Sequence, residues 1–175
     1  MTVQINYNSG SEKKNSSNLV LFVDEKFNIS GLKNHISNIE FSYISDLLKN
    51  SDLKKDLLVF KINSKKTIFL ASIKKDIQTS DIENLGAKFH GYINYDNKSD
   101  YIVNSDTVTS KIKNFVGYFL HGIKLKSYEF NIYKSKKNKK LASINVVGNK
   151  NKISTQDQLR FKALEEGTFF ARDLV

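Results

Sequence analysis

The sequence contains no cysteine, no proline and no tryptophan. The absence of cysteine excludes a disulfide framework, a thiolate metal site and a thiol nucleophile. The longest uninterrupted apolar run, Leu19 to Val23, is far shorter than the roughly 20 residues that a membrane-spanning helix needs. The first ten residues have neither the basic start nor the apolar stretch of a signal peptide. These observations predict a cytoplasmic protein without a membrane partner.

Arginine is scarce, since Arg160 and Arg172 are the only two arginines among 28 basic residues. The net charge is nevertheless +10, because lysine is abundant. A composition rich in lysine and asparagine and poor in arginine and proline is what an AT-rich genome produces in any of its proteins. Bidentate contacts with bases and phosphates favour the arginine fork. The charge therefore predicts weak, salt-sensitive contacts with polyanions and says little about specificity.

The pattern that is present is that of one α/β domain. With 175 residues, 39% hydrophobic and 26% charged, the chain is long enough to bury a core. Apolar alternation and short apolar runs predict strands at 3–7, 19–23, 57–62, 67–73, 101–103 and 141–147, with a hairpin turn at 63–66. Helical periodicity predicts helices at 39–48, 80–93, 110–123 and 154–175. This alternation predicts a single three-layer domain, with a mixed, mostly parallel sheet and helices on both faces.

The helix predicted at 154–175 is long and has a clear start but no stop signal. Ser154 and Asp157 form a variant of the capping box. No glycine, asparagine or proline follows the helix, and the sequence stops in apolar Leu174-Val175. We therefore expect a continuation of the sequence, with Leu159 to Ala163 packed on the domain and the last turn only partly covered. The positions that define the helical period are Leu159, Ala163, Glu166 or Gly167, Phe170 and Leu174.

A search for catalytic and binding motifs finds none. His35, His90 and His121 fall in no metal-ligand spacing, and the helical pattern places His90 and His121 on helix surfaces. The serines lack G-x-S-x-G and S-x-x-K, and the glycines form neither G-x-G-x-x-G nor a Walker loop. The sequence therefore assigns no catalytic, metal-binding or cofactor-binding residue.

One lysine-rich stretch leaves two interpretations open. A phosphate-tracking loop with neighbouring aromatic rings for base stacking would make the chain a nucleic-acid-binding module. A solvated hairpin with Tyr128, Phe130 and Tyr133 packed inward is the interpretation that their core-like spacing favours. The lysines concerned are Lys134, Lys136, Lys137, Lys139 and Lys140.

Two segments resemble the leucyl (cytosol) aminopeptidase family. Residues 171–175 match the start of an A-R-D-L-V-N-x-P motif on the helix that joins the N-terminal domain of that family to its catalytic domain. The family's turn after the strand at 67–73 is glycine-rich, whereas this chain has Ile73-Lys74-Lys75-Asp76. The second motif, G-x-x-L-x-x-Y-x-F-x-x-Y-K, is matched by Gly122, Leu125, Tyr128, Phe130, Tyr133 and Lys134.

The resemblance implies a macro-domain-like N-terminal domain at 1–153, followed at 154–175 by the helix that leads to a catalytic domain absent from this sequence. The family's two divalent metal ions (manganese or zinc), catalytic residues and peptide-hydrolysing activity belong to that catalytic domain. The resemblance therefore implies no enzyme activity for this chain alone and a metal-dependent aminopeptidase as its parent. It further implies an assembly or regulatory role in a hexamer and, from some members, weak DNA binding. ADP-ribose binding would follow from the fold by analogy alone.

Overall fold

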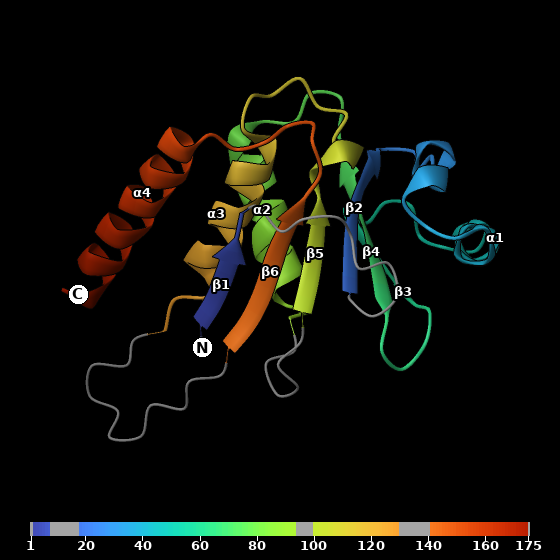
Figure 1. Cartoon of the computed structure of the whole chain (residues 1–175), viewed down its shortest axis with the longest axis horizontal. Coiled ribbons are helices and arrows are strands. Elements are labelled where there is room, and N and C mark those ends of the chain that lie inside the picture. Colours follow the sequence, from blue (N-terminus) through green and yellow to red (C-terminus); the bar gives the residue numbers. More distant parts are fainter. Residues whose placement is uncertain (1, 8–17, 94–99, 130–140, 175) are drawn as a thin grey trace.

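The computed structural model describes residues 2–7, 18–93, 100–129 and 141–174. In this part of the chain six strands form one sheet in the order β1-β6-β5-β2-β4-β3 (Figure 1). Neighbouring strands are parallel, except that β3 and β4 form an antiparallel hairpin. The strands are β1 (Thr2–Asn6), β2 (Asn18–Asp24), β3 (Leu57–Lys61), β4 (Thr67–Ile73), β5 (Asp100–Asn104) and β6 (Leu141–Val147).

Helices cover both faces of this sheet, which confirms the predicted three-layer α/β class (Figure 1). The helices α2 (Thr79–His90) and α3 (Phe115–Lys126) bury one face, and α1 (Asn38–Leu48) with the 3-10 helix η1 (Ser30–Asn34) covers part of the other. The outer face of β1 and β6 is polar, since Asn6 bonds Ser143 and Asn145 there. A second 3-10 helix, η2 (Ser105–Thr107), follows β5, and α4 (Thr155–Asp173) lies against the outer side of α3.

Two glycines bring α2 and α3 into backbone contact. A Cβ atom on Gly86 would overlap the carbonyl oxygen of Phe119, and a Cβ atom on Gly122 would overlap the carbonyl oxygen of Glu83. The close crossing leaves room for a cluster of rings beneath it, in which Phe22 meets Phe119 edge to face at 5.2 Å. The packing of the aromatic core on this face therefore depends on these two glycines as well as on the large side chains.

The starts of two helices differ from the predictions. We predicted a capping box of Ser80 and Glu83, but α2 starts earlier, at Thr79, and its capping box pairs Gln78 with Asp81. The helix predicted to open at Ser110 begins only at Phe115, because Asn114 adopts a left-handed conformation with φ of 60°. A left-handed residue cannot continue a right-handed helix. The apolar pattern that starts near Ser110 therefore begins before the helix does.

The rotation of α4 also differs from the prediction. We expected Leu159 to Ala163 to pack on the domain, but both of these residues are exposed and Phe161 between them is buried. The N-terminal cap is as predicted, since the Ser154 hydroxyl accepts a hydrogen bond from the Asp157 backbone N–H at 3.1 Å. The helix therefore starts where the sequence indicates but turns a different face to the domain.

Candidate functional site

The inward face of α4 is fixed by one ring. Phe161 is 5% exposed, and its ring meets Tyr118 edge to face at 5.1 Å and lies 5.5 Å from the ring of His121. Gly117 lies beneath this ring, and a Cβ atom there would overlap it. The position of α4 therefore depends on Phe161 and on the absence of a side chain at residue 117.

Polar contacts tie the C-terminal half of α4 to the end of α3. Lys124 Nζ lies 3.1 Å from Glu165 Oε1, and Arg172 Nη1 donates a hydrogen bond of 2.8 Å to the Leu125 carbonyl. Tyr128 donates its hydroxyl hydrogen to Asp173 Oδ1 at 2.7 Å. Leu125 and Tyr128 belong to one of the two aminopeptidase-like segments, while Arg172 and Asp173 belong to the other. The two segments thus contact each other, and their residues together hold the end of α4 against α3.

The opposite face of α4 carries an apolar line that faces solvent within the described structure. Leu159, Phe170 and Leu174 are 64%, 67% and 71% exposed. Ala163 and Gly167 lie between them and are exposed as well, and a Cβ atom on Gly167 would meet nothing within 4 Å. We call Leu159, Ala163, Gly167, Phe170 and Leu174 the outer stripe. Because aligned apolar side chains on a surface mark contact sites, the outer stripe is the leading candidate for a partner interface.

The predicted nucleic-acid contacts lie outside the described residues. Lys134, Lys136, Lys137, Lys139 and Lys140 all fall within the range 130–140, as does Phe130. Tyr128 is half-buried and packs its ring near Phe169 at 5.2 Å. Nucleic-acid binding through this loop therefore stays a prediction.

The prediction that His121 lies on a helix surface is wrong. The residue is 8% exposed, because α4 covers the side of α3 on which it stands. Its Nδ1 lies 2.8 Å from Oε1 of Glu83 on α2, and its Nε2 is buried without a hydrogen-bond partner among the described residues. His90 is half-buried at the end of α2, where burial and the positive charge of Lys126 lower its pKa.

The turn after β6 forms no open phosphate cradle, because its backbone N–H groups already have partners. Gly148 has a φ of 114° and leads to backbone N–H groups that would suit an anion. The Asp106 carboxylate already accepts the N–H groups of Asn149, at 2.8 Å, and of Lys150. The Ser105 hydroxyl closes the same turn by donating to the Lys150 carbonyl at 2.6 Å. The geometry therefore gives no support to ADP-ribose binding at this edge.

The departure from the aminopeptidase pattern after β4 has a structural counterpart. Lys74 Nζ lies 2.9 Å from Oδ1 of Asp56, and Lys88 contacts the other oxygen of the same carboxylate. The hydrogen bonds from Lys88 and Lys74 lower the pKa of Asp56, although partial burial opposes them. Where the family has a glycine-rich turn, this chain thus has a lysine that ties β4 to the start of β3.

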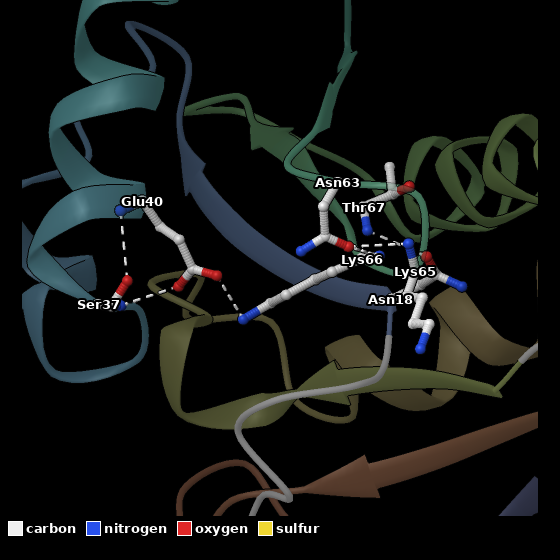
Figure 2. Close-up of polar contacts among 7 residues, drawn as sticks. All are labelled: Asn18, Ser37, Glu40, Asn63, Lys65, Lys66 and Thr67. Carbon is white, nitrogen blue, oxygen red and sulfur yellow. Dashed lines mark hydrogen bonds and ion pairs between the residues drawn. The ribbon is translucent and has the colours of Figure 1, made fainter.

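A buried ion pair holds the hairpin turn against α1 (Figure 2). Lys66 Nζ lies 2.6 Å from Glu40 Oε1, and Glu40 Oε2 also accepts the Ser37 N–H in the capping box of α1. On the turn itself, Asn63 Oδ1 accepts the backbone N–H groups of Lys65 and Lys66. The ion pair and hydrogen bonds of this network join the turn to the start of α1, which gives the network a structural role.

The described residues contain no group of three or more histidine, cysteine, aspartate or glutamate side chains placed to hold a metal ion. The two divalent ions implied by the resemblance do not fit any site that this part of the chain offers. No helix among the described residues is long and apolar enough to cross a membrane.

Comparison with known proteins gives a match in structure but not in sequence. No protein-family model and no curated protein matches the sequence. A tomato leucine aminopeptidase variant matches 94% of the chain with a TM-score of 0.61 and 14% identity. The bottromycin maturation enzyme BotP in complex with Mn matches 91% with a TM-score of 0.60 and 11% identity. The cytosol aminopeptidase from Coxiella burnetii matches 98% with a TM-score of 0.59 and 10% identity.

The matches cover nearly all of this chain but little of the other proteins. The chain spans 36%, 31% and 32% of the lengths of these three proteins. The TM-scores establish a likeness of fold, and the low identities show no more than that. The chain has the fold of the N-terminal region of leucine aminopeptidases, as its two motif segments predicted.

Proposed function

We propose that the chain acts as the non-catalytic N-terminal domain of a metal-dependent leucyl aminopeptidase and that its role is in assembly. The outer stripe of α4 is the single observation that carries this proposal. It is an aligned apolar surface on the face of the helix that the domain itself leaves uncovered. The likeness of fold to leucine aminopeptidases supports an aminopeptidase as the protein in which such a domain works.

The proposed partner of the outer stripe is a catalytic domain in the same protein. Burial of one large apolar side chain is worth about 1.5–3 kcal/mol, so covering Leu159, Phe170 and Leu174 gives a substantial drive for docking. The small residues Ala163 and Gly167 let a partner backbone approach α4 closely between the large ones. In this proposal the peptide-hydrolysing activity and two divalent ions (manganese or zinc) belong to the catalytic domain, and the assembled protein is a cytoplasmic hexamer.

The test compares the chain alone with the longer protein that the proposal requires, in which a catalytic domain follows the chain. The purified chain should release no product from leucyl-p-nitroanilide in the presence of manganese or zinc. In the longer protein, the double substitution of Phe170→Ser and Leu174→Ser should reduce both hexamer content and aminopeptidase activity, measured by sedimentation and by product release. Leu53→Ser is the matched control, because Leu53 is an exposed leucine outside α4.

Two outcomes would contradict the proposal. Metal-dependent turnover by the chain alone would show that it contains an active site. Unchanged assembly and activity in the double variant would show that the outer stripe does not dock on a catalytic domain.

A further inference from the structure

Strand β1 stands at one end of the sheet, and one of its sides is unpaired among the described residues. It pairs only with β6, and no strand in residues 2–7, 18–93, 100–129 and 141–174 pairs with its other side (Figure 1). A free strand edge presents alternating N–H and C=O groups, which form a template for a further strand. β1 has five residues, so at about 3.3 Å per residue the edge offers a ladder of about 16 Å.

A groove of about 510 Å³ runs beside this edge, between β1, α3 and α4. Two lysines and two glutamates, Lys124, Lys162, Glu165 and Glu166, line it and pair with one another, so their charges cancel. The groove therefore suits a ligand with little net charge and apolar side chains. Its apolar lining and aromatic rings come from Val3, Ile5, Tyr7, Leu120, His121 and Phe161.

His121 supplies an unused hydrogen-bonding nitrogen at this groove. Its Nδ1 lies 2.8 Å from Oε1 of Glu83 on α2. Because the two ring nitrogens point in nearly opposite directions, Nε2 is directed away from α2, to the side on which Phe161 and the groove lie. Nε2 is buried and has no partner among the described residues, which is rare for a buried polar atom in a native structure.

Tyr7 supplies a hydrogen-bond donor on the other wall of the groove. Burial, with a further contribution from the negative charge of Glu165, raises the pKa of Tyr7 to about 12. The hydroxyl therefore keeps its hydrogen at any physiological pH. Tyr7 and His121 thus place two hydrogen-bonding groups beside the edge of β1, where they can meet the polar atoms of a peptide.

We propose that this groove binds an extended, mainly apolar peptide segment of another protein, which adds to the free edge of β1 as a seventh strand. Alternate side chains of the peptide enter the space beside Phe161, and its backbone bonds the β1 ladder, as in other strand-addition complexes. Leu159 of the outer stripe also lines the groove, whereas Phe170 and Leu174 lie outside it. The proposal therefore does not depend on the docking of Phe170 and Leu174.

The test uses the peptide acetyl-Thr-Val-Thr-Val-Thr-Val-Lys-amide and the whole chain. Titration followed by amide nuclear magnetic resonance should shift signals of residues 2–7, 117–124 and 158–166. Two N-methylated isomers, one methylated at the three valine nitrogens and one at the three threonine nitrogens, distinguish strand addition from apolar adhesion. In a strand these two sets of N–H groups point to opposite edges, so one isomer should bind and the other should not.

Substitutions in the groove sharpen the test. Tyr7→Phe removes only the hydroxyl and keeps the aromatic ring, and it should lower the affinity for the peptide by about five- to tenfold. His121→Phe removes Nε2 together with the Nδ1 contact to Glu83 and should lower that affinity at least as much. Phe170→Ser should leave the affinity unchanged, because Phe170 is outside the groove. Equal binding of both methylated isomers, or no shifts at millimolar peptide, would overturn the proposal. Pairing of β1 with β1 of a second copy in place of the peptide would overturn it as well.

Discussion

The hydroxyl of Tyr128 donates a hydrogen bond to Asp173 Oδ1 across 45 residues of sequence, and the Arg172 guanidinium lies 5.4 Å from the centre of the same tyrosine ring. This contact joins the segment after α3 to the last turn of α4. Both of its ends belong to the segments that resemble leucyl aminopeptidases. The resemblance in those segments therefore reflects how α4 is anchored, and it requires no catalytic role for either residue.

Removal of this contact should loosen the end of α4 without unfolding the domain. Tyr128→Phe removes only the donor and keeps the ring beneath Arg172, so amide hydrogen exchange should accelerate at 168–174 and stay unchanged at 155–163. The reason is that Phe161, which holds the first half of the helix, is not touched. Faster exchange over the whole of α4 would show instead that the helix detaches as one unit.

Two glycine substitutions should have opposite effects on stability. Gly122→Ala forces a methyl group into the Glu83 carbonyl at the crossing of α2 and α3, and such overpacking costs about 1–3 kcal/mol. Gly167→Ala places a methyl group in open space on an exposed helix, which should stabilise the chain by about 0.5–1 kcal/mol. Urea unfolding of the two variants measures both free energies, and a neutral Gly122→Ala would contradict the close crossing.

The ion pair of Lys66 and Glu40 should make part of the stability depend on pH. Burial alone would raise the pKa of Glu40, but hydrogen bonds from Lys66 and the Ser37 backbone outweigh it and lower that pKa below the ordinary value of 4.5. A lowered folded-state pKa means that the stabilisation is complete above the unfolded-state value. It is then lost as the pH falls through the folded-state value.

Substitution of Lys66 alone should lower the free energy of unfolding more than substitution of both Lys66 and Glu40. Lys66→Met leaves the carboxylate of Glu40, which is only partly buried, without its ion-pair partner, and this should cost about 1–3 kcal/mol at neutral pH. The double variant Lys66→Met with Glu40→Gln removes the unpaired charge and should recover much of that loss. Urea unfolding between pH 3 and pH 7 checks both points. Equal losses of unfolding free energy in the single and double variants would mean that Lys66 and Glu40 do not stabilise each other.

The sequence predicted the strands well because their signals are local. The apolar runs at 19–23, 57–62 and 67–73 fall within one residue of β2, β3 and β4, and the short polar turn at 63–66 made the hairpin visible. The order of the six strands and the side of the sheet that each helix covers depend on contacts between distant residues. No local pattern carries that information, although a resemblance of two motif segments was enough to indicate the fold.

The candidate site was harder to predict for the same reason. The partner of His121 is Glu83, which lies 38 residues earlier on another helix, so spacing along the chain gave no sign of the pair. The stripe on α4 was found, but a helical period shows only that apolar residues share a face. It does not show whether the domain or a partner covers that face, and here Phe161, outside the stripe, is the residue that the domain buries.

Two phenylalanines on opposite faces of α4 decide whether this orientation of the helix is right. Phe161→Ala empties a buried site between Tyr118, His121 and Gly117 and should cost about 3–5 kcal/mol in the free energy of unfolding. Phe170→Ala changes an exposed residue and should shift that free energy by no more than about 0.5 kcal/mol. The two substitutions are chemically identical and lie nine positions apart on one helix, so helix propensity cancels in the comparison. Urea unfolding of the dilute chain gives both values. A larger loss for Phe170→Ala would mean that the stripe packs on the domain, as the periodicity alone had indicated, and the outer stripe would then not be a docking surface.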